Sequence, residues 1–334
     1  MSLKAYEEGK WQGRVSGKVF FYVVAALWAI AYAMARFTFL GQNKEATLQL
    51  LMEGKAATPF QYRVLIPQFV DFVDKSAEFF GIHFDYLYSY ISVEVVASFL
   101  IIIMLQRYLF LLLGQKNRSY WFSVLLFPLL VFNYVIPKNY AVFYPWDTPA
   151  VLIMLLGLMQ LYQRKWVGYY LVFAIGAWNR ETVCFLTIAY LITSLGRDNL
   201  RTILTHCVAQ LLLWSVVKAI LYSMYHDNSG AGLFQRYHTG TLSTHLSTNL
   251  EALLNPTLLL LVFSSFGFIW LFVIVRYSKI QDPFVRRALH VVWPYILGMM
   301  WVANIDEIRV WGELFPYVAP AFALAWTADK TIRS

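Results

Sequence analysis

The 334-residue sequence predicts an all-α membrane protein: a polytopic helix bundle with about eight full spans and short or re-entrant hairpins, about ten membrane segments in all. Its composition is 59% hydrophobic with a mean hydropathy of +0.54, and many of its apolar runs are long enough to enter a bilayer. No polar stretch is long enough for a separate soluble domain. We therefore expect one transmembrane domain over residues 1–334.

The distribution of basic residues predicts the topology. The formal net charge is +8, and 16 of the 27 Lys and Arg residues fall in the tails and in the connections that we assign to the cytoplasm. Cytoplasmic loops of membrane proteins carry an excess of Lys and Arg, so both termini are expected inside, with residues 1–18 as a cytoplasmic tail. This pattern argues against nucleic acid as a partner. Cys184 and Cys207 lie in apolar segments, which indicates neither a disulfide framework nor a zinc site.

The first span is expected from about Val19 to Leu40, with Arg36 near its outer end, where a long side chain can reach the interface. Residues 41–85 then form an outer-face loop. In this loop Glu45 to Glu53 should be an amphipathic helix lying on the membrane. Farther along, two prolines bracket Arg63 and fix the local chain.

Two more spans, about Tyr86 to Leu113 and Tyr120 to Ile136, lead to a second outer loop, residues 137–149. Its three prolines and four aromatic residues make it stiff and suit it to the membrane interface. Asp147 and Thr148 stand at the end of this loop, where the fourth span begins. They are either N-caps of that span or functional groups, and the sequence leaves both interpretations open.

The apolar stretch from Val167 to Leu195 is interrupted by Asn179-Arg-Glu-Thr182 and has basic residues at both ends, so both ends should be cytoplasmic. Each arm, Trp166–Trp178 and Val183–Leu195, holds 13 residues and reaches roughly 20 Å into a hydrocarbon core roughly 30 Å thick. We therefore predict a short re-entrant hairpin whose charged tip lines a cavity below the outer surface. The alternative is one continuous tilted helix with a structural Arg-Glu pair.

The remaining chain should cross outward from Arg201 to Tyr225 and return from Pro256 to Val275. Residues 226–255 between these spans form a polar outer loop, in which Arg236 and His238 are candidates for acceptor binding or for a lid. A solvated connector is the alternative. A second short hairpin follows, with arms Leu289–Ala303 and Leu314–Trp326 and a charged tip between them. Glu94 and Lys218 lie inside the second and sixth spans.

In this topology, charged residues spread over 250 positions gather in the outer half. They are Arg63, Asp147, Arg180, Glu181, Asp306, Glu307, Arg309 and Glu313. A cavity that mixes arginines and acids suits a phosphorylated lipid with a polar head, because arginine binds phosphate through a planar fork and an acid can take a proton from an attacking hydroxyl. The alternative is structural: Arg180 pairs with Glu307, or Arg309 with Glu181, and only holds the two hairpins together.

Four motifs, in this order, resemble bacterial integral membrane proteins related to the C-type (GT-C) glycosyltransferases. They are Tyr62-Arg-Val-Leu-Ile-Pro67, Trp146-Asp-Thr-Pro149, Asn179-Arg-Glu-Thr182 and Glu307-Ile-Arg-Val-Trp-Gly-Glu-Leu-Phe-Pro316. The resemblance implies transfer of a sugar from a polyprenyl-phosphate donor to an acceptor at the outer face. The sequence departs from that family in two ways: the first outer loop has no paired acidic signature, and the chain has no large soluble C-terminal domain.

The resulting functional prediction is a glycosyltransferase-like protein of the bacterial inner (plasma) membrane, with its site facing the periplasm or the outside, in envelope polysaccharide or glycoconjugate assembly. Asp147 or Glu307 would be the base and Glu181 would help to orient the site. Arg63, Arg180 and Arg309 would bind or position phosphate. No cofactor or metal ligand set is indicated, although the acids could hold a divalent cation. The alternatives are a flippase or transporter of lipid-linked sugars, a polysaccharide polymerase or ligase, and an accessory subunit working with polysaccharide-assembly partners.

Overall fold

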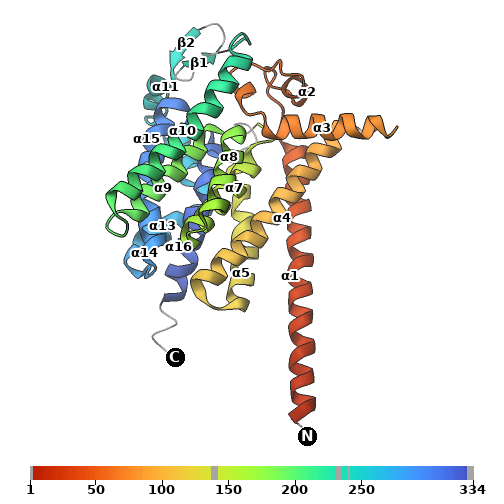
Figure 1. Cartoon of the computed structure of the whole chain (residues 1–334), viewed down its shortest axis with the longest axis vertical. Helices are drawn as coiled ribbons and strands as arrows, with labels where there is room; N and C mark the ends of the chain where they lie inside the picture. Colours follow the sequence, from red (N-terminus) through yellow and green to blue (C-terminus); the bar gives the residue numbers. More distant parts are fainter. Residues whose placement is uncertain (1–2, 84, 137–141, 231–234, 239–240, 329–334) are drawn as a thin grey trace.

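The computed structural model describes residues 3–83, 85–136, 142–230, 235–238 and 241–328, without the side chains of 3–16, 235–238 and 241–243. Nearly all of its regular structure is helical (Figure 1). The α-helices are α1 (Leu3–Phe39), α2 (Leu48–Met52), α3 (Leu65–Phe79), α4 (Tyr86–Leu113), α5 (Lys116–Leu126), α6 (Val131–Tyr134), α7 (Asp147–Gln163), α8 (Trp166–Asn179), α9 (Phe185–Ser194), α10 (Leu200–Tyr225), α11 (His245–Ala252), α12 (Pro256–Phe263), α13 (Ile269–Val275), α14 (Pro283–Ala288), α15 (Val292–Val302) and α16 (Phe315–Thr327).

Short 3-10 helices and one hairpin connect the longer elements. The 3-10 helices are η1 (Phe60–Tyr62), η2 (Phe127–Leu130), η3 (Glu181–Cys184), η4 (Ser265–Phe268), η5 (Tyr277–Lys279), η6 (Leu289–Val291) and η7 (Ile308–Leu314). Strands β1 (Gln235–His238) and β2 (Thr241–Thr244) pair antiparallel, with Gln235 opposite Thr244. The prediction of an all-α protein therefore holds, apart from this hairpin.

Three helical segments in the described part are long and apolar enough to cross a membrane: Gly17–Phe39 within α1, all of α4, and all of α10. The pair α11 and α12 would be a fourth if counted as one span, although it is bent by 95°. These segments are consistent with an integral membrane protein. Apolar side chains such as Leu27 of α1 and Leu212 of α10 face outward and are exposed, as expected for surfaces in contact with lipid.

The core lies where α4, α7 and α16 meet. α7 packs against α4 and α8, and α16 packs against α4, α7 and α13. Close approach in this region depends on Gly312 of η7, because a Cβ atom there would lie 2.1 Å from the Tyr134 hydroxyl. η7 is held further by buried Asn133, which donates to the Ile308 carbonyl at 3.1 Å. The packing thus fixes η7 against α6 at the centre of the molecule.

The chain reverses direction between α8 and α9, as expected. Arg164, just before α8, donates to Asp198, just after α9, at 2.8 Å, and the Trp166 and Tyr190 rings are 5.5 Å apart. In a continuous helix, Trp166 and Tyr190 would be about 36 Å apart, so the straight-helix alternative is wrong. Burial tends to raise the pKa of Asp198, but its hydrogen bond from Arg164 prevails and lowers this pKa below its ordinary value.

The second predicted hairpin also returns on itself. After α15, the chain passes through η7 and α16 comes back to contact η6 and α14, which precede α15. The Tyr295 hydroxyl of α15 donates to the Val310 carbonyl of η7 at 2.7 Å, which ties the outgoing arm to the tip. Both charged tips are therefore turns between two short helices.

Two predicted elements differ from the structure. The helix expected from Glu45 to Glu53 is only the five-residue α2, because Gly54 follows with a left-handed φ of +73° and ends it. The span expected from Pro256 to Val275 is broken into α12 and α13 by three consecutive left-handed residues, Phe266, Gly267 and Phe268. The Asn133 side chain accepts the Phe266 N–H at 2.9 Å and stabilises this break.

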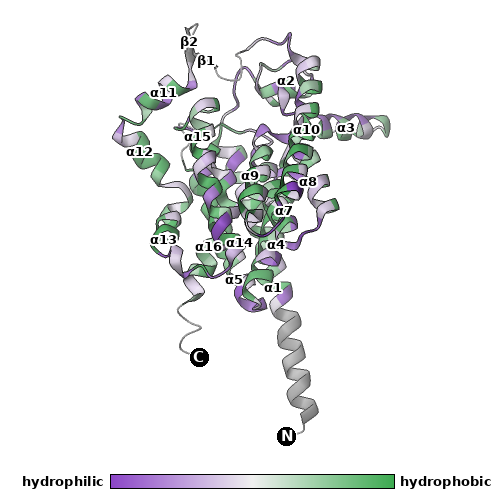
Figure 2. Ribbon diagram, turned by 60° about the vertical axis from the view of Figure 1, so that its left-hand side comes forward, coloured by the Kyte–Doolittle hydropathy of each residue, from purple (hydrophilic) through white to green (hydrophobic). Residues whose placement is uncertain are grey.

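The two ends of the helical body are different. The beginning of α1 and the end of α16 point toward the lower end of Figure 1, whereas α2, α3 and the β1–β2 hairpin lie at the upper end. In the rotated view of Figure 2, α2 and α3 again lie toward the upper end and the end of α16 toward the lower end.

Candidate functional site

Asp147, the first residue of α7, is the centre of a buried charged network. Its carboxylate is 0% exposed and accepts hydrogen bonds from three arginines. Oδ1 accepts from Arg180 at 3.1 Å and from Arg309 at 3.3 Å, and Oδ2 accepts from Arg36 at 3.4 Å. The N-terminus of a helix also favours negative charge. Trp146 is the N-cap and makes no side-chain capping bond, so the capping interpretation of Asp147 is wrong.

Arg36, Glu94 and Thr148 form the inner side of the network. Arg36 donates to Glu94 at 2.6 Å and to the Thr148 hydroxyl at 2.7 Å, and that hydroxyl donates to Glu94. All three side chains are buried, and the rings of Phe143 and Tyr134 lie beside the guanidinium at 4.9 and 5.1 Å. The expectation that Arg36 reaches the interface is therefore wrong, because its charge is neutralised inside the bundle. Thr148 is not a cap either.

Arg180 lies at the turn between α8 and α9. Its backbone is extended, with φ −160° and ψ 150°, which ends α8 and directs the side chain toward Asp147. The other ion pair of Arg180 is with Glu313 of η7, at 2.8 Å. Arg180 therefore joins the two hairpin tips through Asp147 and Glu313. The specific pairings proposed for a structural role, Arg180 with Glu307 and Arg309 with Glu181, do not occur among the described contacts.

Glu307 and Arg309 form one outer edge of the network. Arg309 donates to Glu307 through Nη2 and to Asp147 through Nη1, and Asn304 donates to the second oxygen of Glu307 at 2.7 Å. The Glu307 side chain is 28% exposed. The Glu307 carboxylate is therefore held in place and is still accessible from the surface of the protein.

Arg63, Glu181 and Lys218 form the other outer edge. Arg63 donates through Nε to Glu181 at 3.1 Å, and Lys218 lies 3.8 Å from the other oxygen of Glu181 while donating to the Ala177 carbonyl at 2.8 Å. Glu181 is 21% exposed. In the described part of the chain, the two terminal nitrogens of Arg63 make no hydrogen bond.

An aromatic stack joins the two outer edges. The ring of Tyr144 is stacked against those of Phe60 and Trp146, with centroid distances of 5.4 and 4.8 Å, and the Phe60 and Trp146 centroids are 6.5 Å apart. Arg309 lies over Tyr144 at 4.2 Å, and Arg63 over Trp146 at 5.0 Å, both within the range of cation–π attraction. The stack therefore contacts an arginine of each outer edge.

Among the ion pairs that the structure describes, the formal charges of the network cancel. Its five cations are Arg36, Arg63, Arg180, Arg309 and Lys218, and its five acids are Glu94, Asp147, Glu181, Glu307 and Glu313. Buried charges are tolerated in a low-dielectric interior only when they are paired and hydrogen-bonded. Loss of one member therefore leaves an uncompensated charge.

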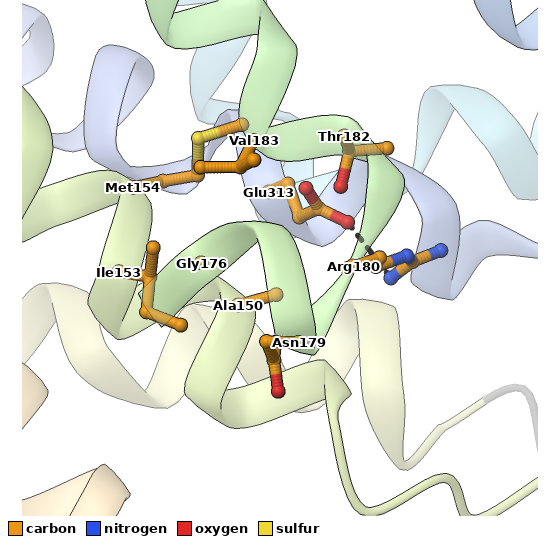
Figure 3. Close-up of a pocket in the computed structure, with 9 residues that line it drawn as sticks. All are labelled: Ala150, Ile153, Met154, Gly176, Asn179, Arg180, Thr182, Val183 and Glu313. Atoms are coloured by element: carbon orange, nitrogen blue, oxygen red, sulfur yellow. Dashed lines mark ion pairs between the residues drawn. The ribbon is translucent and has the colours of Figure 1, made fainter. Parts of the chain in front are cut away.

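The interior of the network is packed rather than hollow. The cavity beside Arg180 has a volume of only about 10 Å³ and is lined by Glu313, Thr182, Asn179 and apolar residues of α7, α8 and η3 (Figure 3). Ligand pockets usually measure about 300–1,000 Å³, so this cavity is too small for a sugar or a lipid head group. The accessible parts of the network are therefore its outer edges, at Glu307 and at Glu181.

The structure brings together most of the residues that the sequence singles out: Arg63, Asp147, Arg180, Glu181, Glu307, Arg309 and Glu313. The side chains of Arg236 and His238 lie outside the described residues. Among the described residues, no group of three His, Cys, Asp or Glu side chains is arranged to hold a metal ion. Sequence reasoning did not assign Arg36, Glu94 or Lys218 to the site, although each is a charged residue inside a predicted span, which is the signal that could have identified them.

Comparison with known proteins does not identify a family. No protein-family model, no curated protein and no solved structure matches the chain.

Proposed function

We propose that the protein is a GT-C-like glycosyltransferase of the bacterial inner membrane. It would transfer a sugar from a polyprenyl-phosphate-linked donor to an acceptor at the outer face, in envelope polysaccharide or glycoconjugate assembly. The observation that carries the proposal is the pairing of two accessible acids with arginines, Glu307 with Arg309 and Glu181 with Arg63, on opposite edges of one buried network. The order of the four motifs gives it independent support.

In this proposal, Glu307 is the general base and Arg63 binds the donor phosphate. Glu307 takes the proton of the acceptor hydroxyl, whose oxygen then forms a bond to the anomeric carbon of the donor sugar. The bond from that carbon to the phosphate oxygen breaks, and polyprenyl phosphate leaves with the electron pair. Glu307 ranks ahead of Asp147 because Asp147 has no exposed atom and is shared by three arginines. Arg180 and Arg309 hold Asp147 and the tips in position.

The proposal includes a topology with both termini in the cytoplasm and about eight to ten membrane segments. Support comes from the charge asymmetry and from the ends of α1 and α16, which point the same way (Figure 1). The charged network would then open to the periplasm or the outside, where lipid-linked sugars are used. A divalent cation held by the acids and a further protein partner are additional components of the proposal that remain to be tested.

Cysteine labelling tests this topology. In a background with Cys184 and Cys207 replaced by alanine, Ser229→Cys is expected to react with an impermeant thiol reagent from outside intact cells. Ser278→Cys is expected to react only after the membrane is opened. Both positions are exposed, so access decides the result. External labelling of Ser278→Cys would reverse the topology and place the network on the cytoplasmic side.

Arg63→Lys tests phosphate binding. Lysine keeps the positive charge next to Glu181 but loses the planar fork, so the fold should be preserved. Hydrogen bonds to charged groups contribute about 1.5–3 kcal/mol, which corresponds to about a 10- to 150-fold loss in kcat/KM for the donor. The matched control is Arg107→Lys at an exposed position of α4, which should transfer sugar normally. Normal kcat/KM in Arg63→Lys would remove Arg63 from the phosphate site.

A flippase or transporter of lipid-linked sugars is the second candidate. It is favoured by the interrupted helices, the 95° bend between α11 and α12 and the break at η4, since broken helices are common at transporter sites. A transporter would move the donor across a vesicle membrane without breaking the sugar–phosphate bond.

A further inference from the structure

α3 carries an apolar stripe that no other part of the described chain covers. Phe69, Phe72 and Phe79 recur at helical spacing on one side of the helix, and Phe80 at its C-cap extends the row. Phe72, Phe79 and Phe80 are 68%, 85% and 75% exposed. Single exposed apolar residues are common on protein surfaces, but a contiguous row of phenylalanines indicates a contact surface.

The other sides of α3 are occupied differently. Ile66, Pro67 and Val70 are buried, and the helix contacts α2, α4 and α8. The polar side carries Asp71 and Glu78, and Lys75, at the border between this side and the stripe, pairs with Asp71 at 2.7 Å. α3 therefore has an apolar face, partly against the protein and partly free, and carries its charged residues on a different side.

The direction of α3 identifies what covers the stripe. α3 runs across the direction of α1 in both Figure 1 and Figure 2, near the end of α1 that is farther from its start. α1 and α4 are candidate spans, and Tyr88 in the first turn of α4 is itself exposed. A helix at the end of a span and across it lies along the membrane surface.

We propose that α3 is an interfacial helix whose phenylalanine stripe inserts into the outer lipid surface. Amphipathic helices of this kind lie in the plane of the interface with the apolar face about 5–10 Å deep at the head-group boundary, while the charged face stays in water. α3 thus takes the surface role that was predicted for Glu45–Glu53. α3 would lie at the membrane surface in this way whether or not the protein is an enzyme.

The position of α3 has a consequence for the phosphate site, and this step rests on the proposed function. Arg63 precedes α3 by two residues, and the residue between them, Val64, is buried. An interfacial α3 therefore holds Arg63 close to the level of lipid phosphates. A polyprenyl-phosphate donor could then present its phosphate to Arg63 while its chain stays in the membrane.

Spin-label accessibility tests the location of α3. Ser76 lies between Phe72 and Phe79 on the stripe, and Glu78 lies on the charged face. The variants Ser76→Cys and Glu78→Cys, without Cys184 and Cys207, are labelled with a nitroxide and reconstituted in vesicles of phosphatidylethanolamine and phosphatidylglycerol. Oxygen concentrates in lipid, whereas a water-soluble nickel complex stays in water. The ratio of the collision rate with oxygen to the collision rate with the nickel complex is expected to be several-fold higher at Ser76 than at Glu78.

Two outcomes would overturn the proposal. Equal access of the nickel complex to both labels would mean that α3 projects into water. Protection of the Ser76 label from both reagents, with dipolar broadening between labels, would mean that a second copy of the chain covers the stripe. If Ser76→Cys does not fold, Phe80→Cys reports the same face. Because accessibility is read without any turnover, the result is independent of whether the protein transfers sugar.

Discussion

Asp147→Ala is expected to prevent accumulation of folded protein. Three arginines share this carboxylate, and all three are buried, so its removal leaves their charges uncompensated. Breaking a buried ion pair by removing one partner costs about 3–5 kcal/mol, against a total stability of about 5–15 kcal/mol for a typical domain. The amount of monodisperse protein in detergent and its thermal midpoint measure the effect. The control is Asp227→Ala. The Asp227 side chain is 91% exposed, so this variant should behave like the unmodified protein.

Charge compensation separates this explanation from a simple packing defect. In Asp147→Asn the network carries one excess positive charge, and in the double variant Asp147→Asn with Arg309→Gln the balance returns to zero. Glu307 loses its arginine in that double variant, but it is partly exposed and can be solvated. The double variant should therefore be more stable than Asp147→Asn alone, a coupling that a cycle of single and double variants measures. Wild-type stability in Asp147→Ala, with transfer lost, would instead assign Asp147 to the chemistry.

The reversal at Asn179–Thr182 could be predicted because two local signals agree. Basic residues at both ends assign both ends to one side, and the polar tip cannot continue an apolar helix cheaply. The Arg164–Asp198 pair then closes the base of the hairpin. The gathering of distant charges was predictable for a similar reason, since each charge in an apolar environment needs a partner.

The partners themselves could not be predicted. Hydropathy indicates depth in a membrane but not which helix lies beside which, so Arg36 was assigned to the interface although it contacts Glu94, which is 58 positions away. The break at Phe266–Phe268 was missed for a related reason. Left-handed backbone is unfavourable for phenylalanine, and it is stabilised here by Asn133, a residue 133 positions away, which no local pattern reveals.

Glu307→Gln is expected to slow sugar transfer by about 100- to 10,000-fold, the usual contribution of a general base, while leaving the fold intact. Glutamine has nearly the same shape, and its amide oxygen can still accept from Arg309 or Asn304, which hold the present carboxylate. Partial exposure of the side chain further limits the cost of lost charge. The measurement is release of polyprenyl phosphate from a panel of polyprenyl-phosphate sugars by purified protein in vesicles, with donor binding measured in parallel.

The matched control is Glu53→Gln, the same substitution at an outer-loop glutamate that is 37% exposed and that pairs, in the described part of the chain, with the exposed Lys55 and Gln49. It should leave transfer unchanged. Glu181→Gln should act mainly through Arg63, so its effect should appear in the KM for the donor more than in kcat. Equal transfer by Glu307→Gln and the unmodified protein would rule out Glu307 as the base. In the contrary outcome, the unmodified protein releases no polyprenyl phosphate and moves a fluorescent lipid-linked sugar across the vesicle membrane. The charged network would then serve transport, because binding and release of an intact donor require phosphate-binding arginines but no base.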